Sequence, residues 1–179
     1  CGSILEQREE RTFNTSVVFD RSGEKVAQYS KIHLFDIEIP GGIVYKESDV
    51  VTPGQEIVTF DCEGVTVGLT ICYDIRFPEL YRILAERGAS LVLVPAVFTL
   101  MTGKDHWEPL IKARAIENLC YVAASGNWGM CPPKYNSYGH SMVVNPWGTM
   151  LAQAADCETT IAADLDFELM HSIREKLPA

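Results

Sequence analysis

The sequence lacks the features that mark several large classes of protein. It has no run of about 18 apolar residues, the length a transmembrane helix needs. Its first ten residues lack the basic start and apolar stretch of a secretory signal. Basic residues are few, since 15 Lys and Arg stand against 24 Asp and Glu, for a formal net charge of −9. We therefore expect no membrane partner, and no nucleic-acid partner, because phosphate binding needs clustered positive charge.

Cysteine and histidine spacings typical of zinc sites are also missing. None of the six cysteines forms a Cys-x-x-Cys pair and the four histidines are scattered, so no metal site is predicted. Most of the cysteines lie in apolar runs, as buried free thiols do. We expect reduced thiols and a cytoplasmic location. The length of 179 residues, with 47% hydrophobic residues, predicts a single globular domain over residues 1–179.

The first third of the chain reads as strands joined by turns. Residues 15–19 and 26–29 are rich in β-branched and aromatic side chains, and the polar segment 20–24 between them predicts a turn. Residues 36–54 predict a longer loop, because Pro-Gly pairs interrupt them twice.

The middle of the chain predicts a strand, a helix and a second strand in a parallel sheet. Residues 65–71 form an apolar strand that ends at Cys72. Pro78 in the first turn and Gly88 after the last predict a helix over 78–87. The nearly continuous apolar run 90–95 is typical of a strand covered on both faces.

The second half repeats this alternation. A helix is predicted over 107–119 with Pro109 in its first turn, followed by a buried strand over 120–124. Further elements are predicted as two strands around the turn 145–148, a strand over 160–163 and a helix over 167–176. The fold class is therefore α/β.

Cys72 is the first candidate for chemistry. It stands where an apolar strand stops and a helix is about to begin, the place where α/β enzymes present a nucleophile. Outward-pointing backbone N–H groups and the nearby helix start would stabilise a thiolate and a developing oxyanion. The alternative is an inert thiol at the end of a strand.

Three charged residues are further candidates. Lys31 follows a predicted strand; it is either a solvated edge residue or, if it lies near the thiol, a stabiliser of a tetrahedral intermediate. Taken alone, Glu47 is interpreted as a surface charge in a loop. Arg76 would bind an anionic substrate group or form a structural pair with Asp74 or Glu79. His33 and His106 are interpreted as hydrogen-bonded framework residues.

Taken together, several motifs resemble the nitrilase superfamily of carbon–nitrogen hydrolases over residues 14–177. They occur in the family's order, which makes the resemblance strong although each motif alone is weak. The motifs are Ser-Lys-Ile-His-Leu-Phe-Asp at 30–36, Glu-Ser at 47–48 with Pro-Gly at 53–54, Ile-Cys-Tyr-Asp-Ile-Arg-Phe-Pro-Glu-Leu at 71–80, His-Trp-Glu at 106–108, Ala-Arg-Ala-Ile-Glu-Asn at 113–118 and Asn-Pro-Trp-Gly at 145–148.

The resemblance implies a four-layer αββα sandwich and a set of site residues. By motif, Cys72 is the nucleophile, Lys31 the catalytic lysine and Glu47 the acid that supports it. The backbone N–H of Tyr73 would bind the oxyanion, and Arg76 is the nearest cation for a substrate carboxylate. No metal or organic cofactor is implied, and members of the family commonly dimerise through a helical layer.

The resemblance also implies that an N-terminal segment of the family is absent from these 179 residues, which are slightly short at the C-terminus too. The family's general-base Glu belongs to that segment, so we expect these residues alone to be inactive. Segment 36–42 looks most like the omega-amidase branch, which hydrolyses 2-oxoglutaramate and 2-oxosuccinamate to acid and ammonia. Deaminated-glutathione amidase is a near alternative.

Two other interpretations remain open at this point. Cys1 could act as an N-terminal nucleophile that uses its own α-amine as base. The chain could also be a catalytically incomplete scaffold, or a binding or dimerisation module.

Overall fold

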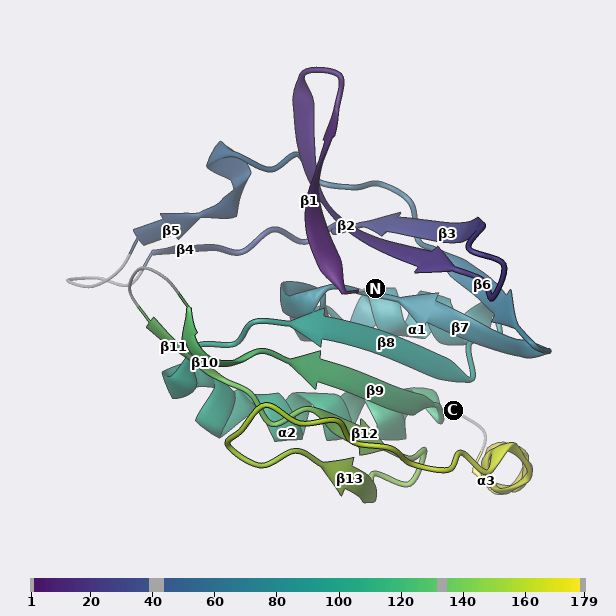
Figure 1. Ribbon diagram of the computed structural model, residues 1–179. Coiled ribbons are helices and arrows are strands. Elements are labelled where there is room, and N and C mark those ends of the chain that lie inside the picture. The colour runs from purple at the N-terminus through teal and green to yellow at the C-terminus, as the bar shows by residue number, and fades with distance from the viewer. Residues whose placement is uncertain (1, 39–43, 132–134, 178–179) are drawn as a thin grey trace.

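The computed structural model describes residues 2–38, 44–131 and 135–177. Its centre is a six-stranded sheet in the order β13-β12-β9-β8-β7-β6 (Figure 1). The three central strands are parallel, as the strand–helix–strand pattern predicted, and the other three pair antiparallel. The strands are β6 (Thr59–Cys62), β7 (Val65–Leu69), β8 (Leu91–Ala96), β9 (Tyr121–Gly126), β12 (Met142–Val144) and β13 (Met150–Gln153).

Two helices, α1 (Pro78–Glu86) and α2 (Leu100–Asn118), cover one face of this sheet. The side chains of β8 alternate, so that Val92 and Val94 face the helices and join their apolar side chains in the main core. The helix predicted over 78–87 is confirmed, and Gly88 follows it with a φ of 88°, a left-handed conformation suited to glycine.

The start of α2 was predicted wrongly. The helix begins at Leu100 and not at Trp107, because the side chain of Thr99 accepts a hydrogen bond from the Thr102 N–H and caps it. Pro109 therefore lies inside the helix and not in its first turn. The helix predicted over 167–176 is confirmed as α3 (Phe167–Lys176).

A second, three-stranded sheet faces the first. It is antiparallel and consists of β1 (Ser3–Arg8), which the sequence did not predict, β2 (Arg11–Phe19) and β3 (Lys25–Ser30). Val18 and Ala27 of this sheet pack with Leu69 and Leu93 of the large sheet. The described residues thus form a helical layer and two facing sheets, and the predicted α/β class is confirmed.

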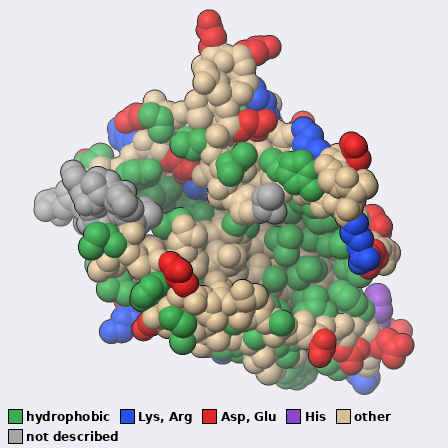
Figure 2. Space-filling view, in the orientation of Figure 1, with side chains coloured by type: hydrophobic (Ala, Val, Ile, Leu, Met, Phe, Trp, Pro, Cys, Tyr) green, Lys and Arg blue, Asp and Glu red, His purple; other side chains and the backbone are tan. Residues whose placement is uncertain are grey.

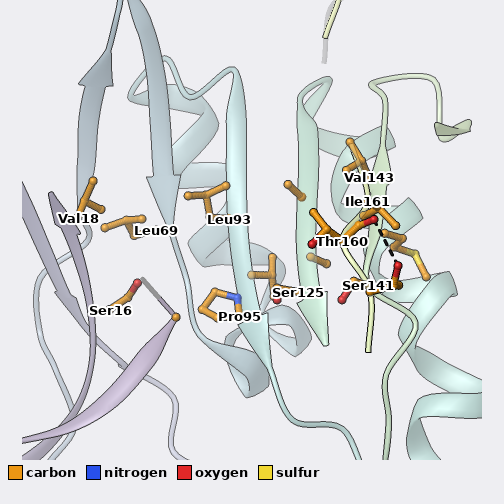
Figure 3. A pocket seen from close by; sticks show the side chains of 16 residues that line it. Ser16, Val18, Leu69, Leu93, Pro95, Ser125, Ser141, Val143, Thr160 and Ile161 are labelled. Carbon is orange, nitrogen blue, oxygen red and sulfur yellow. Dashed lines mark hydrogen bonds between the residues drawn. The ribbon is translucent and has the colours of Figure 1, made fainter. Parts of the chain in front are cut away.

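Beside the small sheet, the face of the large sheet that points away from α1 and α2 borders a cavity. Figures 1 and 2 look onto this face, with α1 and α2 behind the sheet and hydrophobic side chains gathered below the β2–β3 pair. This cavity of about 600 Å³ lies between Val18 and Leu69 on one side and Thr160 and Ile161 on the other (Figure 3). The strand predicted over 160–163 is wrong, because these residues form an irregular segment along the cavity.

The structure contains two further β-hairpins that the sequence did not predict, one of them within the predicted loop 36–54. Within 36–54, β4 (Asp36–Glu38) pairs with β5 (Val44–Lys46), and the 3₁₀ turn η1 (Glu47–Asp49) follows. Part of the 36–42 motif, residues 39–42, lies outside the described residues. The second hairpin, which the sequence did not predict, pairs β10 (Trp128–Cys131) with β11 (Tyr135–Tyr138). Within the described residues, no helix is long and apolar enough to cross a membrane.

Candidate active site

The structure joins Lys31 and Glu47 in a buried ion pair. Lys31 Nζ lies 2.5 Å from Glu47 Oε2, and the two side chains are only 3% and 9% exposed. Lys31 follows β3, where its N–H donates to the Asn14 carbonyl and its own carbonyl accepts from the Gly54 N–H. A Cβ at Gly54 would lie 2.0 Å from the Ser30 carbonyl oxygen, so only glycine allows this approach. Neither residue is the solvated surface charge that its local sequence permitted.

Glu47 is held on both carboxylate oxygens. Oε2 also accepts from the Phe35 N–H at 2.7 Å, and Oε1 accepts from Asn14 Nδ2 at 3.0 Å. Burial alone would raise the pKa of Glu47, but the hydrogen bonds from Lys31, Asn14 and Phe35 outweigh burial and hold the pKa below its usual value. Glu47 is therefore an anion that is placed to compensate the Lys31 ammonium.

Cys72 lies on a tight turn between β7 and α1, as the sequence predicted. It is the first residue of the 3₁₀ turn η2 (Cys72–Arg76) and has a φ of 49°, a left-handed conformation that is uncommon for a residue with a Cβ. Cys72 is half-buried, and its Sγ lies 3.5 Å from the carbonyl oxygen of Val97, the residue after β8. Strained backbone at a strand–helix turn is typical of a nucleophile held in place.

The electrostatics of Cys72 differ from the expected thiolate. Burial raises the pKa of the Cys72 thiol, and the positive charge of Lys31 opposes this only in part. The resting group is therefore the thiol, which needs a base to become a nucleophile. Ile32, the residue after Lys31, packs against the same two apolar clusters as Cys72, which places the segment of the lysine beside the turn of the thiol.

Asp74 is a part of the site that the sequence did not reveal. The sequence suggests Asp74 only as an ion-pair partner of Arg76, but its buried carboxylate accepts hydrogen bonds from Tyr29, His33 and Ile71. His33 also stacks on Phe77 with ring centroids 3.7 Å apart, in agreement with its interpretation as a framework residue. The sequence signal that could have identified Asp74 is its position, two residues after the candidate nucleophile.

Arg76 lies near Cys72 in the same turn but pairs with neither predicted carboxylate. In the part of the chain that the structure describes, no ion pair links it to Asp74 or Glu79. Its Nη2 lies 3.2 Å from His106 Nδ1, and its guanidinium lies 5.8 Å from the centre of the Tyr73 ring. Arg76 thus has no structural salt bridge there that would compete for an anionic ligand.

The described residues leave three expectations without a direct test. Tyr73 directly follows Cys72, and its ring packs edge-on against Phe35 and Phe77; the oxyanion role of its N–H stays a prediction. Cys1 lies outside the described residues. Among those that are described, no group of three or more His, Cys, Asp or Glu is placed to hold a metal ion.

Comparison with known proteins identifies the family. A profile of the carbon–nitrogen hydrolases matches residues 1–175. The chain belongs to the carbon–nitrogen hydrolase family. The human omega-amidase NIT2 is 44% identical over 177 residues, which cover 99% of this chain and 64% of that protein. A deaminated glutathione amidase of Synechocystis sp. is 41% identical, over 94% of this chain and 63% of that protein.

A solved structure agrees with the described fold. Saccharomyces cerevisiae Nit3, a member of branch 10 of the nitrilase superfamily, superimposes with a TM-score of 0.89 at 35% identity, over 99% of this chain and 62% of that one. The nitrilase-type fold expected from the motifs is thereby confirmed. The chain spans less than two thirds of the length of each of these three relatives.

Proposed function

We propose that the protein hydrolyses a small carboxylate-bearing amide of the 2-oxoglutaramate or 2-oxosuccinamate type to the acid and ammonia. One observation carries this proposal: a buried Lys31–Glu47 ion pair lies beside the strained turn of Cys72, since Ile32 packs against the same apolar clusters as that thiol. A lysine ammonium beside a cysteine thiol suits attack on a carbonyl carbon, because the ammonium stabilises the oxyanion that forms. The name of the human relative, omega-amidase, supports the substrate class.

The proposed reaction proceeds through a thioester. A base takes the proton of Cys72 Sγ, the sulfur attacks the amide carbon, and the carbonyl electron pair moves onto oxygen. The Lys31 ammonium and the Tyr73 N–H stabilise that oxyanion, each by about 3–4 kcal/mol. The intermediate collapses, ammonia leaves with the proton returned by the base, and water then hydrolyses the thioester.

The base is proposed to be neither Glu47 nor Asp74. Three hydrogen-bond donors hold the carboxylate of Glu47 and four hold that of Asp74. The raised pKa of Cys72, caused by burial, makes a base necessary. We assign this role to the general-base glutamate of the family. None of the motifs that this chain shares with the family contains that glutamate.

Arg76 is the proposed partner of the substrate carboxylate. A guanidinium binds a carboxylate through two parallel hydrogen bonds, and Arg76 stands in the turn that Cys72 begins. Its described contacts are the imidazole of His106 and the rings of Tyr73 and Phe98. No carboxylate of the described residues pairs with it, so a substrate carboxylate would supply its counter-charge.

The proposal extends to compartment and assembly. Cys62, Cys72, Cys120 and Cys157 are free thiols, which supports a reducing, cytoplasmic environment. We also propose a homodimer formed through the helical layer, where Ile83 of α1 and Ile116 of α2 are 36% and 48% exposed. Light scattering of the full-length protein tests the dimer.

Deaminated glutathione amidase is the second candidate activity. The Synechocystis relative of that name is 41% identical to this chain, close to the 44% of the human omega-amidase. Both activities would use the same Cys72 and Lys31 chemistry and differ in the size of the acid portion that the site accepts.

The test is ammonia release by the full-length protein with 2-oxoglutaramate, 2-oxosuccinamate, deaminated glutathione and a simple nitrile. We expect fastest release from the 2-oxo acid amides, and loss of at least two orders of magnitude in Cys72→Ser and Lys31→Ala with the fold retained. Preference for deaminated glutathione would select the second candidate. Absence of ammonia from every compound, or near-normal rates in either variant, would refute the proposal.

A further inference from the structure

We propose that Asp74 is a positioning residue that holds the segment carrying Lys31 against the turn carrying Cys72. Its carboxylate has no exposed surface and accepts four hydrogen bonds, two on each oxygen. The donors come from both sides of the site. The inference deepens the proposed amidase function, and its kinetic test rests on that function.

On the side of the nucleophile, Asp74 closes the turn that presents the thiol. The N–H of Ile71, the residue before Cys72, donates to Asp74 Oδ2 at 2.8 Å. The Asp74 N–H donates back to the Ile71 carbonyl oxygen at 3.1 Å. These reciprocal bonds bracket Cys72, whose φ of 49° needs such restraint because the conformation is unfavourable for a cysteine.

On the side of the lysine, the same carboxylate holds the backbone that follows Lys31. His33 donates to Asp74 Oδ1 from its N–H at 3.1 Å and from its ring Nδ1 at 2.8 Å. The Tyr29 hydroxyl donates to Oδ2 at 2.7 Å and accepts from the Ile32 N–H at 3.3 Å. The two residues after Lys31 are thus tied to Asp74, one directly and one through Tyr29.

Replacement of Asp74 by asparagine keeps the shape of the side chain but breaks this arrangement. The amide NH₂ must take the place of one carboxylate oxygen, where it meets a backbone N–H of either His33 or Ile71. Two donors cannot pair, so one backbone N–H is left without its acceptor in either orientation. The variant therefore loosens one side of the site while it adds no bulk.

A positioning role and a purely electrostatic role of Asp74 predict opposite changes in the pKa of Cys72 when Asp74 is replaced. The positive charge of Lys31 lowers the pKa of this thiol, and the negative charges of Glu47 and Asp74 raise it. Removing the negative charge of Asp74 alone would lower the pKa of Cys72. Displacing the Lys31 ammonium would raise it.

The experiment measures the rate at which iodoacetamide alkylates Cys72 as a function of pH, read by mass spectrometry of the peptide that carries it. We expect the pH midpoint of Cys72 alkylation to rise by roughly 0.5–1 pH unit in Asp74→Asn, which is a part of the pKa shift that a close opposite charge causes. In a Lys31→Met background, Asp74→Asn should cause no further rise. A midpoint that stays or falls in Asp74→Asn overturns the proposal.

Two further variants keep the test decisive. Tyr29→Phe removes one of the four hydrogen bonds and the link to Ile32, so the midpoint should rise by a smaller amount. This variant decides the matter if Asp74→Asn does not fold, and an unchanged midpoint in it then contradicts the proposal. Asp61→Asn, at an exposed carboxylate of β6, is the matched control and should leave the midpoint unchanged.

The kinetic test separates this inference from the proposed function. Misplacement of Lys31 by a fraction of an ångström to 1 Å should lower kcat of Asp74→Asn by up to about 10²-fold, with KM within about threefold. Alkylation needs no substrate, so a protein that releases no ammonia still reports on Asp74. A kcat unchanged from the wild type in an active enzyme contradicts the positioning role.

Discussion

Replacement of Glu47 by glutamine tests whether the Lys31–Glu47 pair stabilises the fold as well as the site. Glutamine keeps the length of the side chain and removes its charge, so the Lys31 ammonium, 3% exposed, loses its counter-charge. Removing one partner of a buried ion pair costs about 3–5 kcal/mol. Because the glutamine oxygen still accepts a hydrogen bond, we expect the lower end, about 3 kcal/mol.

Urea denaturation of the full-length protein at pH 7 measures this change. With a denaturant slope of about 2 kcal/mol/M, a loss of 3 kcal/mol lowers the midpoint by about 1.5 M. The exposed Glu56→Gln substitution is the control and should stay within about 0.5 kcal/mol of the wild type. Activity should fall by orders of magnitude in the Glu47 variant only.

A double variant distinguishes the charge from the packing. Lys31→Met combined with Glu47→Gln removes both charges and keeps an amide oxygen as an acceptor for the Phe35 N–H, so no buried charge is left without its partner. We expect it to recover much of the lost unfolding free energy and none of the activity. A Glu47→Gln variant within 0.5 kcal/mol of the wild type would refute the reasoning, because Lys31 would then need no counter-charge.

Three further predictions concern the pH dependence and the backbone. Hydrogen bonds hold the pKa of Glu47 below its usual 4.5 against the effect of burial, so the unfolding free energy should fall as the pH drops below about 4.5, and less so in Glu47→Gln; denaturation at several pH values measures this. Glu63→Asn should stabilise by about 0.5 kcal/mol, because Glu63 and Gly64 both have positive φ in a two-residue hairpin turn; an unchanged urea midpoint contradicts it. Gly103→Ala should destabilise by about 1–3 kcal/mol, since its Cβ would lie 2.3 Å from Tyr138; a melting temperature equal to the wild type contradicts it.

Elements with clear boundaries were predictable from the sequence. Pro78 and Gly88 mark the two ends of α1, and the apolar run of β8 marks a strand covered on both faces. The beginning of α2 was not predictable in this way, because residues 100–106 carry no apolar stripe and the Thr99 cap is a single side chain. The strand predicted at 160–163 failed because an apolar–polar alternation also suits an irregular segment along a cavity.

Cys72, Lys31 and Glu47 could be named as candidates from the sequence, whereas the part of Asp74 and the connections between these residues could not. Position alone singled out Cys72, whereas the local sequence of Lys31 and Glu47 also suited surface residues, and family motifs assigned their roles. The hydrogen bonds of Asp74 to Tyr29 and His33 join residues 45 and 41 positions apart. Such long-range contacts arise from the packing of β3 beside the turn after β7, which no local pattern encodes.

The central claim is that Cys72 carries the acyl group during hydrolysis. Rapid acid quenching of the full-length protein during turnover of 2-oxoglutaramate, followed by peptide mass spectrometry, tests it directly. We predict that the peptide with Cys72 gains the mass of the acyl group, and that Cys72→Ala shows no such gain. Ammonia release with the acyl group on another residue, or undiminished release by Cys72→Ala, would contradict the claim.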